Sequence, residues 1–382
     1  MNTIVYFFFV ISCVTAACEG SMEHIMQDKT DRVRDFLEDQ IRSHKSPGLQ
    51  YVVTGPDSEI FSYAGGWADV AALRPILPAT TMMIYSMTKT VTAIAALQLV
   101  EKKKISLDDP VIDYIRDMPY GNGVSIRHLI SQTSGIPNPI PLKWVHSSEE
   151  HSKFDESMAL KRIMAENPRL DFKPGNKYRY SNISYWLLGR IIEKASGTGY
   201  EDYMRKNIFQ RLKLPLGEID FVIPSLHNHS KGYIPKWSAL NLFKGILIER
   251  RFIGEYENGW LNIKDHYLNG PSFGGIVCSA RAIGAVLRDL LKNDSALLDE
   301  KSKSLLFEQQ RDNDGDPVEM TLGWHMRSTK NTSFFYKEGG GAGFHSEMRI
   351  YPRSRLASII IANNASFDVK TVLDTVDREF LQ

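Results

Sequence analysis

Ser86 and Lys89 are spaced so that both could take part in one acyl-transfer reaction. Residues Thr90 to Val100 are good helix formers with apolar side chains at helical spacing, which predicts a helix that begins near Ser86 and buries one face. A serine in a first helical turn has backbone amides beside its hydroxyl, which is the geometry of an oxyanion hole. Lys89 lies on the same helix face and would act as a base if burial lowers its pKa. Ser-x-x-Lys also arises by chance, and a serine at a helix start is commonly an N-cap, so the pair alone decides nothing.

The triplet Tyr180-Ser181-Asn182 stands directly before an amphipathic helical pattern at residues 185–194. A tyrosine at such a junction could hold the proton that the serine loses and pass it to a leaving group, provided that nearby ammonium groups lower its pKa. The amide of Asn182 could bind Lys89 and a substrate carbonyl. The triplet also fits a helix N-cap next to a core tyrosine, so its chemistry depends on what else the chain supplies.

A glycine tract at the end of a β-rich run is the third candidate element. The run starts at Ser333 and reaches the tract at residues 339–341, where a strand edge without side chains would let a substrate backbone approach closely. Lys337 would place a positive charge at this edge, beside Gly339 and Gly340. On its own, the tract fits a bulge or a loop equally well.

The surrounding patterns place strands near both chain ends and helices between them. The stretch from about 90 to 215 is mostly helical, and a turn at Gly55-Pro56-Asp57 joins the first two strands into a hairpin. The predicted helices lie at residues 28–44, 111–115, within 125–137, and at 158–164, 185–194 and 369–380. The predicted strands lie at residues 49–54, 60–64, 346–351 and 356–363.

Composition excludes several classes of protein. At 382 residues with 43% hydrophobic content, the chain can bury a large core. Its 46 basic and 45 acidic residues give a formal charge of +1 without long single-sign runs, so neither nucleic acid nor a strongly anionic partner is indicated. The three cysteines, Cys13, Cys18 and Cys278, do not support a disulfide framework.

Residues 1–18 are typical of an export signal. An apolar run from Ile4 to Val14, too short to span a bilayer, is followed by small residues and Cys18. We expect this segment to be removed and the protein to be periplasmic, secreted or, if Cys18 is lipidated as in a lipobox, anchored to a membrane. No Lys or Arg precedes the run, and Thr15 stands where a lipobox usually has leucine, so a buried N-terminal strand is the alternative.

Together, the three elements resemble the serine β-lactamase and penicillin-binding-protein superfamily, on the class C β-lactamase-like branch that includes D-peptidases and family VIII carboxylesterases. The resemblance runs from about residue 30 to the end, and supporting stretches carry it further. These stretches are Ser46-Pro47-Gly48, Leu107-Asp108-Asp109-Pro110, Gln132 to Pro137, Leu214 to Gly217, Phe273 to Arg281 and Leu322-Gly323-Trp324.

The resemblance implies an α+β fold of the β-lactamase/transpeptidase type. An antiparallel sheet flanked by helices would come from about residues 30–85 and 270–382. A mostly helical subdomain would be inserted at about 86–269, and residues 19–382 would form a single catalytic domain.

The resemblance also implies catalytic roles. Ser86 matches the acylated nucleophile, Lys89 the lysine that takes its proton and Tyr180 the proton-shuttling tyrosine. The implied mechanism acylates Ser86 and then releases the acyl group to water, with no metal and no cofactor.

Four further residues match the family's substrate-binding positions. Asn182 matches the substrate-positioning amide, Lys337 the lysine of the third motif and Gly339 its glycine. Gly340 would complete an oxyanion hole together with the amide of the nucleophile.

Three departures from the family pattern bear on the substrate. Glu338 stands where β-lactamases carry a threonine that helps to hold the carboxylate of the drug, and Gln132 replaces the usual histidine. Residues 224–265 match no motif, and their apolar stretch at 240–252 is expected to shape the substrate pocket or a lid. If Glu338 points into the site, it repels a substrate carboxylate, which favours neutral esters over β-lactams and D-peptides.

The sequence therefore predicts a serine hydrolase that acts on small-molecule esters or amides, with carboxylesterase-like activity favoured. A class C-like β-lactamase or a D-peptidase is the first alternative. The second is a catalytically weak receptor that binds peptidoglycan fragments or drugs.

Overall fold

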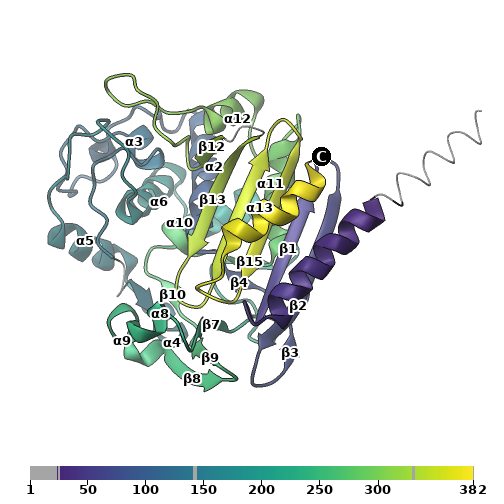
Figure 1. Cartoon of the computed structure of the whole chain (residues 1–382). Coiled ribbons are helices and arrows are strands. Elements are labelled where there is room, and N and C mark those ends of the chain that lie inside the picture. The colour runs from purple at the N-terminus through teal and green to yellow at the C-terminus, as the bar shows by residue number, and fades with distance from the viewer. Residues whose placement is uncertain (1–23, 25, 141–143, 329–331, 382) are drawn as a thin grey trace, which may run out of the picture.

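A seven-stranded antiparallel sheet built from both ends of the chain is the centre of the structure (Figure 1). Its strand order is β12-β13-β14-β15-β1-β2-β3, so the last strands of the chain pair with the first through β15 and β1. The strands are β1 (Gly48–Thr54), β2 (Glu59–Asp69), β3 (Arg74–Pro75), β12 (His325–Ser328), β13 (Ser333–Gly340), β14 (His345–Tyr351) and β15 (Leu356–Ala362). The predicted α+β fold, with its sheet drawn from both chain ends, is confirmed.

The computed structural model describes residue 24 and residues 26–140, 144–328 and 332–381. The predicted signal at residues 1–18, with Cys18, lies outside the described residues and stays a prediction. Within the described residues, no helix combines the length and apolar composition that crossing a bilayer requires.

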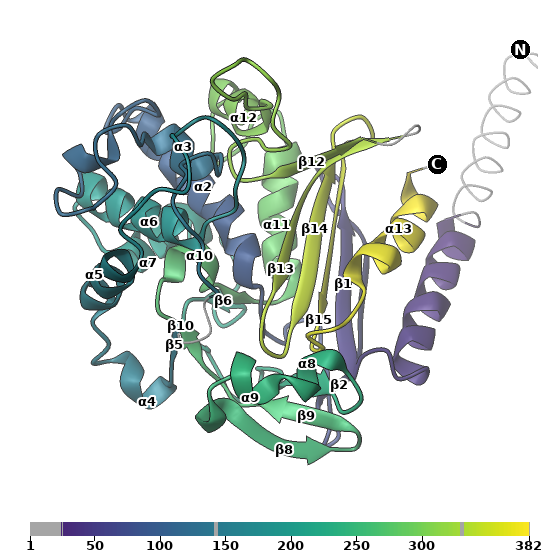
Figure 2. The ribbon, with the colours of Figure 1, turned by 60° about the vertical axis from the view of Figure 1, so that its left-hand side comes forward.

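Helices cover both faces of the large sheet (Figure 2). One face packs against a helix over residues 26–42 and α13 (Val369–Phe380), while the other packs against α11 (Ala280–Leu291). In β1, the side chains of Tyr51 and Val53 pack in the core on the α13 side of the sheet. The side chain of Val52 packs in the core on the α11 side. This alternation follows from the period of two in a strand, and it makes the sheet buried on both sides.

The region between the two halves of the sheet is helical around α2 and also holds small sheets. Its helices are α2 (Thr88–Glu101), α3 (Ile126–Ile130), α4 (Ser148–His151), α5 (Glu156–Glu166), α6 (Asn182–Ser196), α7 (Tyr200–Met204) with the π-turn Arg205–Phe209, α8 (Ala239–Leu242), α9 (Lys244–Leu247) and α10 (Pro271–Gly274), and α12 (Glu300–Phe307) follows α11. The short strands are β4 (Met82–Met83), β5 (Val145–His146), β6 (Ile219–Asp220), β7 (Gly232–Pro235), β8 (Ile253–Glu257), β9 (Trp260–Ile263), β10 (Tyr267–Leu268) and β11 (Val277–Cys278). The 3-10 turns are Tyr85–Met87, Val111–Asp113 and Arg250–Phe252.

Most of the predicted elements are confirmed, and the exceptions have physical reasons. The hairpin of β1 and β2, the strands β14 and β15, and the helices α5, α6 and α13 lie where the sequence predicts them. The helix predicted at 111–115 is wrong, because only the 3-10 turn Val111–Asp113 forms, directly after Pro110, which bridges to Ser125. The predicted mostly helical character of 86–269 overlooks the three-stranded sheet β7-β9-β8, whose short strands give little periodicity.

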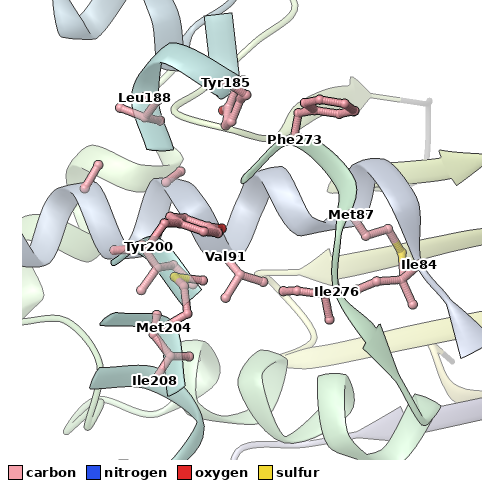
Figure 3. Packing of buried hydrophobic residues seen from close by; sticks show 14 of the residues in the cluster. Ile84, Met87, Val91, Tyr185, Leu188, Tyr200, Met204, Ile208, Phe273 and Ile276 are labelled. Atoms are coloured by element: carbon pink, nitrogen blue, oxygen red, sulfur yellow. The ribbon is translucent and has the colours of Figure 1, made fainter. Parts of the chain in front are cut away.

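Helix α2 is buried on all sides rather than on the single face that its sequence predicts. Every side chain from Thr88 to Leu99 is buried, and α6, α7, α10 and α12 surround the helix. Figure 3 shows Val91 among apolar side chains contributed by several of these elements. The polar side chains on α2 find partners inside the core, as when the Thr92 hydroxyl donates to the carbonyl of Ser272. A helix that is enclosed in this way holds its first turn firmly in place.

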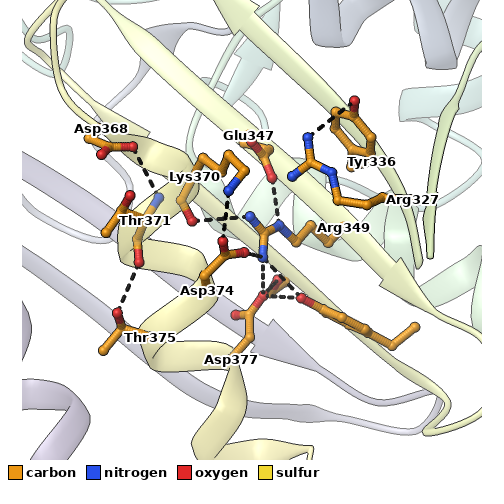
Figure 4. Close-up of polar contacts among 12 residues, drawn as sticks. Arg327, Tyr336, Glu347, Arg349, Asp368, Lys370, Thr371, Asp374, Thr375 and Asp377 are labelled. Atoms are coloured by element: carbon orange, nitrogen blue, oxygen red, sulfur yellow. Dashed lines mark hydrogen bonds and ion pairs between the residues drawn. The ribbon is translucent and has the colours of Figure 1, made fainter. Parts of the chain in front are cut away.

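A buried ion network fastens α13 to the sheet (Figure 4). The guanidinium of Arg349 donates to Glu347 at 2.5 Å and to Asp374 of α13 at 2.7 Å. Asp377, one helical turn further on, accepts hydrogen bonds from the hydroxyls of Tyr351 and Ser358, each at 2.7 Å. These charges are compensated inside the protein, so removing one of them would leave the others unpaired.

Candidate active site

Ser86 lies in the 3-10 turn Tyr85–Met87, immediately before α2. The turn is strained, because Tyr85 has a φ of 43°, a left-handed conformation that is uncommon for a bulky residue. Two contacts hold it there. The Tyr85 hydroxyl donates to the carbonyl of Ala342 at 2.6 Å, and Gly341 packs so closely on the tyrosine ring that a Cβ at that position would collide with it.

The structure brings the first and second candidate elements into hydrogen-bonding contact. The Ser86 hydroxyl lies 2.6 Å from the Tyr180 hydroxyl and 3.1 Å from Nζ of Lys89. Nζ of Lys89 also donates to Oδ1 of Asn182 at 2.8 Å and to the carbonyl of Phe273 at 2.6 Å. The carbonyl of Phe273, in α10, is the contact that sequence reasoning missed, because a backbone oxygen leaves no signal in residue type.

Burial first, and the nearby charge of Lys337 second, hold the pKa of Lys89 well below its usual range. A neutral lysine amine has two N–H groups and one lone pair. The Asn182 oxygen and the Phe273 carbonyl accept the two N–H groups, which leaves the lone pair for the hydroxyl of Ser86. The geometry therefore suits a base that takes the proton of Ser86. Burial also lowers the pKa of Lys89, which is the requirement for that role predicted from the sequence.

The pKa of Tyr180 moves in the direction opposite to the one its role as a proton acceptor requires. Burial raises it, and this effect outweighs the hydrogen bond between Tyr180 and Ser86, which lowers it. The amines of Lys89 and Lys337, which lie near the ring, do not reverse the shift. Tyr180 is therefore protonated at neutral pH, and its hydroxyl is a proton donor rather than a proton acceptor.

Strand β13 places the third candidate element beside Ser86. Lys337 is buried, with its Nζ 4.9 Å from the centre of the Tyr180 ring, and burial lowers its pKa to about 7. Gly339 faces the carbonyl of Ile84, which a Cβ at that position would strike, so this glycine lets β13 approach the nucleophile turn. Gly340 lines the same cavity as Ser86, whereas neither Lys337 nor Gly339 is among the lining residues.

Glu338 is not among the described residues that line the cavity. The preference for esters predicted from the sequence rested on repulsion between Glu338 and a substrate carboxylate, and the structure corrects that argument. Its side chain is 54% exposed and accepts a hydrogen bond at 2.6 Å from Nε2 of His345, its neighbour on β14. The alternation of a strand places Glu338 and Lys337 on opposite faces of the sheet. Glu338 is therefore paired with His345 and makes no direct contact with a group bound in the cavity, although its charge still contributes to the pKa values of Tyr180 and Lys337.

Gln132 holds the backbone of the triplet Tyr180-Ser181-Asn182 and does not line the cavity. Its buried side chain accepts from the amide of Ser181 at 2.5 Å and donates to the carbonyl of the same residue at 3.3 Å. These two bonds fix the backbone between Tyr180 and Asn182. Gln132 is not among the described residues that line the cavity, so its replacement of the usual histidine has no direct contact with a substrate.

A cavity of about 210 Å³ opens in front of Ser86. The unassigned segment 224–265 supplies one of its walls, through Leu247, Ile248, Glu249, Phe252 and Ile263. The other lining residues are Tyr85, Ser86, Ile140, Val145, Asn182, His266, Leu268, Phe273, Gly340, Gly341 and Ala342. Among the described lining residues Glu249 is the only carboxylate, and no lysine or arginine is present, so the cavity is apolar with one acidic group.

His266 is the one imidazole in this lining. Burial lowers its pKa, so it is neutral at pH 7, and its Nδ1 lies 3.0 Å from the carbonyl of Lys264. No cluster of three or more potential metal-ligating side chains occurs in the part of the chain that the structure describes.

Comparisons with known proteins agree with this arrangement. The model of the Beta-lactamase family matches residues 30–381. Penicillin-binding protein 4* of Bacillus subtilis (strain 168) is 25% identical over 358 residues, which cover 90% of this chain and 74% of that protein. The chain spans about half the length, or less, of several other curated relatives that it matches.

Two solved structures share the fold at low sequence identity. The D-amino acid amidase from Ochrobactrum anthropi SV3, complexed with L-phenylalanine, has a TM-score of 0.75 and 21% identity, covering 91% of this chain and 97% of that chain. EstCE1, described as a hydrolase with promiscuous acyltransferase activity, has a TM-score of 0.71 and 18% identity, covering 93% of this chain and 99% of that chain. The protein belongs to the Beta-lactamase family and is a serine hydrolase of that family.

Proposed function

We propose that the protein hydrolyses neutral carboxylic esters through an acyl-enzyme on Ser86. The observation that carries this proposal is the contact of the Ser86 hydroxyl with both Lys89 and Tyr180 at the end of an apolar cavity. Lys89 is the base, Tyr180 is the acid, and Asn182 positions the lysine and the substrate carbonyl.

The reaction follows from the protonation states of these groups. Oγ of Ser86 attacks the acyl carbon while its proton moves to Nζ of Lys89, and the amides of Ser86 and Gly340 hold the oxyanion. Tyr180 donates its proton to the departing alcohol oxygen, and the Lys89 ammonium restores it. Water then attacks the acyl-enzyme and gives its proton to neutral Lys89. As the bond between the acyl carbon and Oγ of Ser86 breaks, Tyr180 donates its proton to Oγ, the Lys89 ammonium restores the proton of Tyr180, and the carboxylic acid is released.

The lining of the cavity supports neutral over anionic substrates. The described part of the lining contains no lysine or arginine, and its one carboxylate, Glu249, opposes a bound carboxylate to the extent that its pairing with Arg251 leaves its charge uncompensated. Glu249 is itself held by the guanidinium of Arg251 at 2.9 Å, so its position in the wall is defined. An apolar acyl or alcohol group gains from burial against Leu247, Ile248 and Phe252, at roughly 25 cal/mol for each Å² removed from water.

The deciding experiment compares p-nitrophenyl butyrate, nitrocefin and a D-alanyl peptide on the wild type and on Ser86→Ala, Glu249→Gln and Glu338→Thr. We expect ester turnover at least about tenfold more efficient than nitrocefin turnover, and no activity in Ser86→Ala. Glu249→Gln should raise nitrocefin efficiency by roughly three- to tenfold and leave ester hydrolysis nearly unchanged. The exposed Glu255, on the neighbouring strand β8, supplies the matched control Glu255→Gln.

Three outcomes would contradict the ester proposal. Faster nitrocefin than ester turnover in the wild type would identify a β-lactamase, and a dominant rate on the D-alanyl peptide would identify a D-peptidase. Stable acylation of Ser86 without turnover on any of the three would favour a drug- or peptide-binding receptor. Glu338→Thr should change none of the ratios, because Glu338 is paired with His345 outside the cavity.

A further inference from the structure

The segment that forms one wall of the cavity also carries a group of exposed apolar side chains on its outer side. Trp237 is 90% exposed, Leu242 78%, Ile246 73% and Phe243 51%, and Tyr256 of β8 is exposed as well. We call these five residues the α8–α9 surface. They make up five of the thirteen large exposed hydrophobic residues found among the described residues. Exposed apolar side chains that gather in this way mark an interaction site, whereas single ones are ordinary.

Basic side chains lie beside the α8–α9 surface. Residues 236–251 contain four basic side chains and one acidic side chain, a formal charge of +3, whereas Tyr256 lies between Glu255 and Glu257 on β8. The ammonium groups of Lys236 and Lys244 lie 5.7 and 5.9 Å from the centre of the Tyr256 ring, and Lys236 lies 5.6 Å from that of Trp237. Apolar and cationic groups are thus interleaved at the same place, an arrangement suited to an anionic lipid surface.

The surface is continuous with the cavity wall. In α9 and the turn that follows it, Ile246 points to solvent while the adjacent Leu247 and Ile248 line the cavity. Figure 2 shows α8, α9 and the small sheet β7-β9-β8 gathered at one end of the molecule. A bilayer that meets the α8–α9 surface therefore lies beside the cavity that contains Ser86.

We propose that the α8–α9 surface docks the protein onto anionic lipid membranes. Trp237, Leu242, Phe243 and Ile246 enter the boundary between headgroups and acyl chains, and Lys236 and Lys244 contact the phosphate groups. Tryptophan suits this boundary because its ring is apolar while its N–H remains hydrated. The docked orientation presents the cavity to acyl esters at the lipid surface, a consequence that rests on the proposed function.

The test is binding to vesicles of phosphatidylcholine alone or with 30 mol% phosphatidylglycerol, about a third of the lipid, as in anionic membranes. Every protein carries Ser86→Ala, so that turnover plays no part, and Cys18→Ser, so that no attached lipid contributes. We expect sedimentation with the anionic vesicles, weakened by salt, and a blue shift of tryptophan emission that Trp237→Phe abolishes. Leu242→Ser with Ile246→Ser should weaken vesicle partitioning at least about tenfold, because each loses buried apolar area.

Matched variants separate docking from general effects. Lys236→Gln with Lys244→Gln should weaken binding to anionic vesicles by roughly tenfold or more and leave binding to neutral vesicles unchanged. Leu216→Ser, at a leucine 98% exposed outside the surface, should bind as its parent does. The same thermal unfolding midpoint in all variants shows that each is folded.

Several results would overturn the proposal. No vesicle binding at low salt, or equal loss of binding in Leu216→Ser and in the Leu242→Ser, Ile246→Ser pair, would exclude docking through this surface. A dimer in solution that Leu242→Ser with Ile246→Ser dissociates would make the surface a contact between two copies of the chain instead. Vesicle binding without ester hydrolysis by the Ser86-containing protein would retain the docking surface and reject the proposed ester substrate.

Discussion

Lys89 and Lys337 place their Nζ atoms over the same tyrosine ring, each 4.9 Å from the centre of Tyr180. Both amines are buried, and each arrives from a different part of the fold, α2 for Lys89 and β13 for Lys337. Two ammonium ions so close together in a buried site repel each other, which is why the charge of Lys337 adds to burial in lowering the pKa of Lys89. The third motif therefore acts on the pKa of Lys89.

Replacing Lys337 by methionine should raise the pKa of Lys89. Because Lys89 acts as a base in its neutral form, the rising limb of kcat/KM against pH should move to higher pH, and ester hydrolysis at neutral pH should fall. The measurement is the pH dependence of p-nitrophenyl butyrate hydrolysis. Lys337→Arg, which keeps a positive charge, is the control and should leave the limb near its wild-type position. An unmoved limb in Lys337→Met would show that the two amines are not coupled.

Ser86 should be the single residue that a fluorophosphonate acylates. Its hydroxyl is the one that contacts both Lys89 and Tyr180, and it opens onto the cavity. Intact mass spectrometry should show one adduct in the wild type and none in Ser86→Ala. Ser346, a buried serine whose hydroxyl donates to the carbonyl of Gly339, provides the control, and Ser346→Ala should still be labelled. An adduct that survives in Ser86→Ala would reject the assignment.

Tyr180→Phe should lower the turnover of an alkyl ester such as ethyl butyrate, measured by titration of the acid released, by about two to four orders of magnitude, the usual contribution of a positioned acid or base. The pKa of Tyr180 is raised by burial, so its hydroxyl keeps the proton that the leaving group needs. Tyr178→Phe is the matched control, because the Tyr178 hydroxyl contacts His325 at 3.1 Å rather than the nucleophile. A Tyr180→Phe enzyme at the wild-type rate would leave Lys89 as the sole proton-transfer group.

Much of this arrangement is readable from the sequence where the signal is local. The spacing of Ser86 and Lys89 puts both on one helix face, and the helix start at the triplet before α6 places Tyr180 and Asn182 at a junction. Each of these predictions needs only the helical repeat and the residues next to it. The family resemblance adds what no local pattern contains, namely that the three elements meet.

The features of the site that the sequence does not predict depend on contacts between residues far apart in the chain. The orientation of Glu338 follows from the alternation of β13, a signal that the sequence does contain, but its partner His345 is fixed only by the β13–β14 register. The cavity wall at Leu247, Ile248 and Phe252 comes from turns and very short helices, which have no periodicity to detect. The acceptor for Lys89 at Phe273 is a backbone carbonyl, which any residue could supply.

Arg349→Met should lower the free energy of unfolding by about 3–5 kcal/mol, since it leaves buried carboxylates at Glu347 and Asp377 without their cation. Denaturant unfolding measures this change. Arg42→Met is the control, because Arg42 pairs with Asp39 at 3.8 Å on the surface and should contribute at most about 1 kcal/mol. A similar small loss in both variants would mean that water reaches the Arg349 network.

The last prediction concerns the pH dependence of substrate preference. Burial lowers the pKa of Lys337 to about 7, against a smaller opposing effect of Glu338, so its positive charge is present below that pH and is lost above it. Lys337 lies beside Tyr180 and outside the cavity lining, so its charged form attracts a bound carboxylate only from a distance, whereas a neutral ester has no such group. The ratio of kcat/KM for nitrocefin to that for p-nitrophenyl butyrate should therefore fall by up to roughly tenfold as the pH rises from about 6 to 8. Lys89 takes part in the hydrolysis of both substrates, so the effect of its titration on kcat/KM cancels in this ratio. In Lys337→Met the ratio should be low and independent of pH, and a wild-type ratio that stays flat or rises would show that Lys337 does not meet the carboxylate.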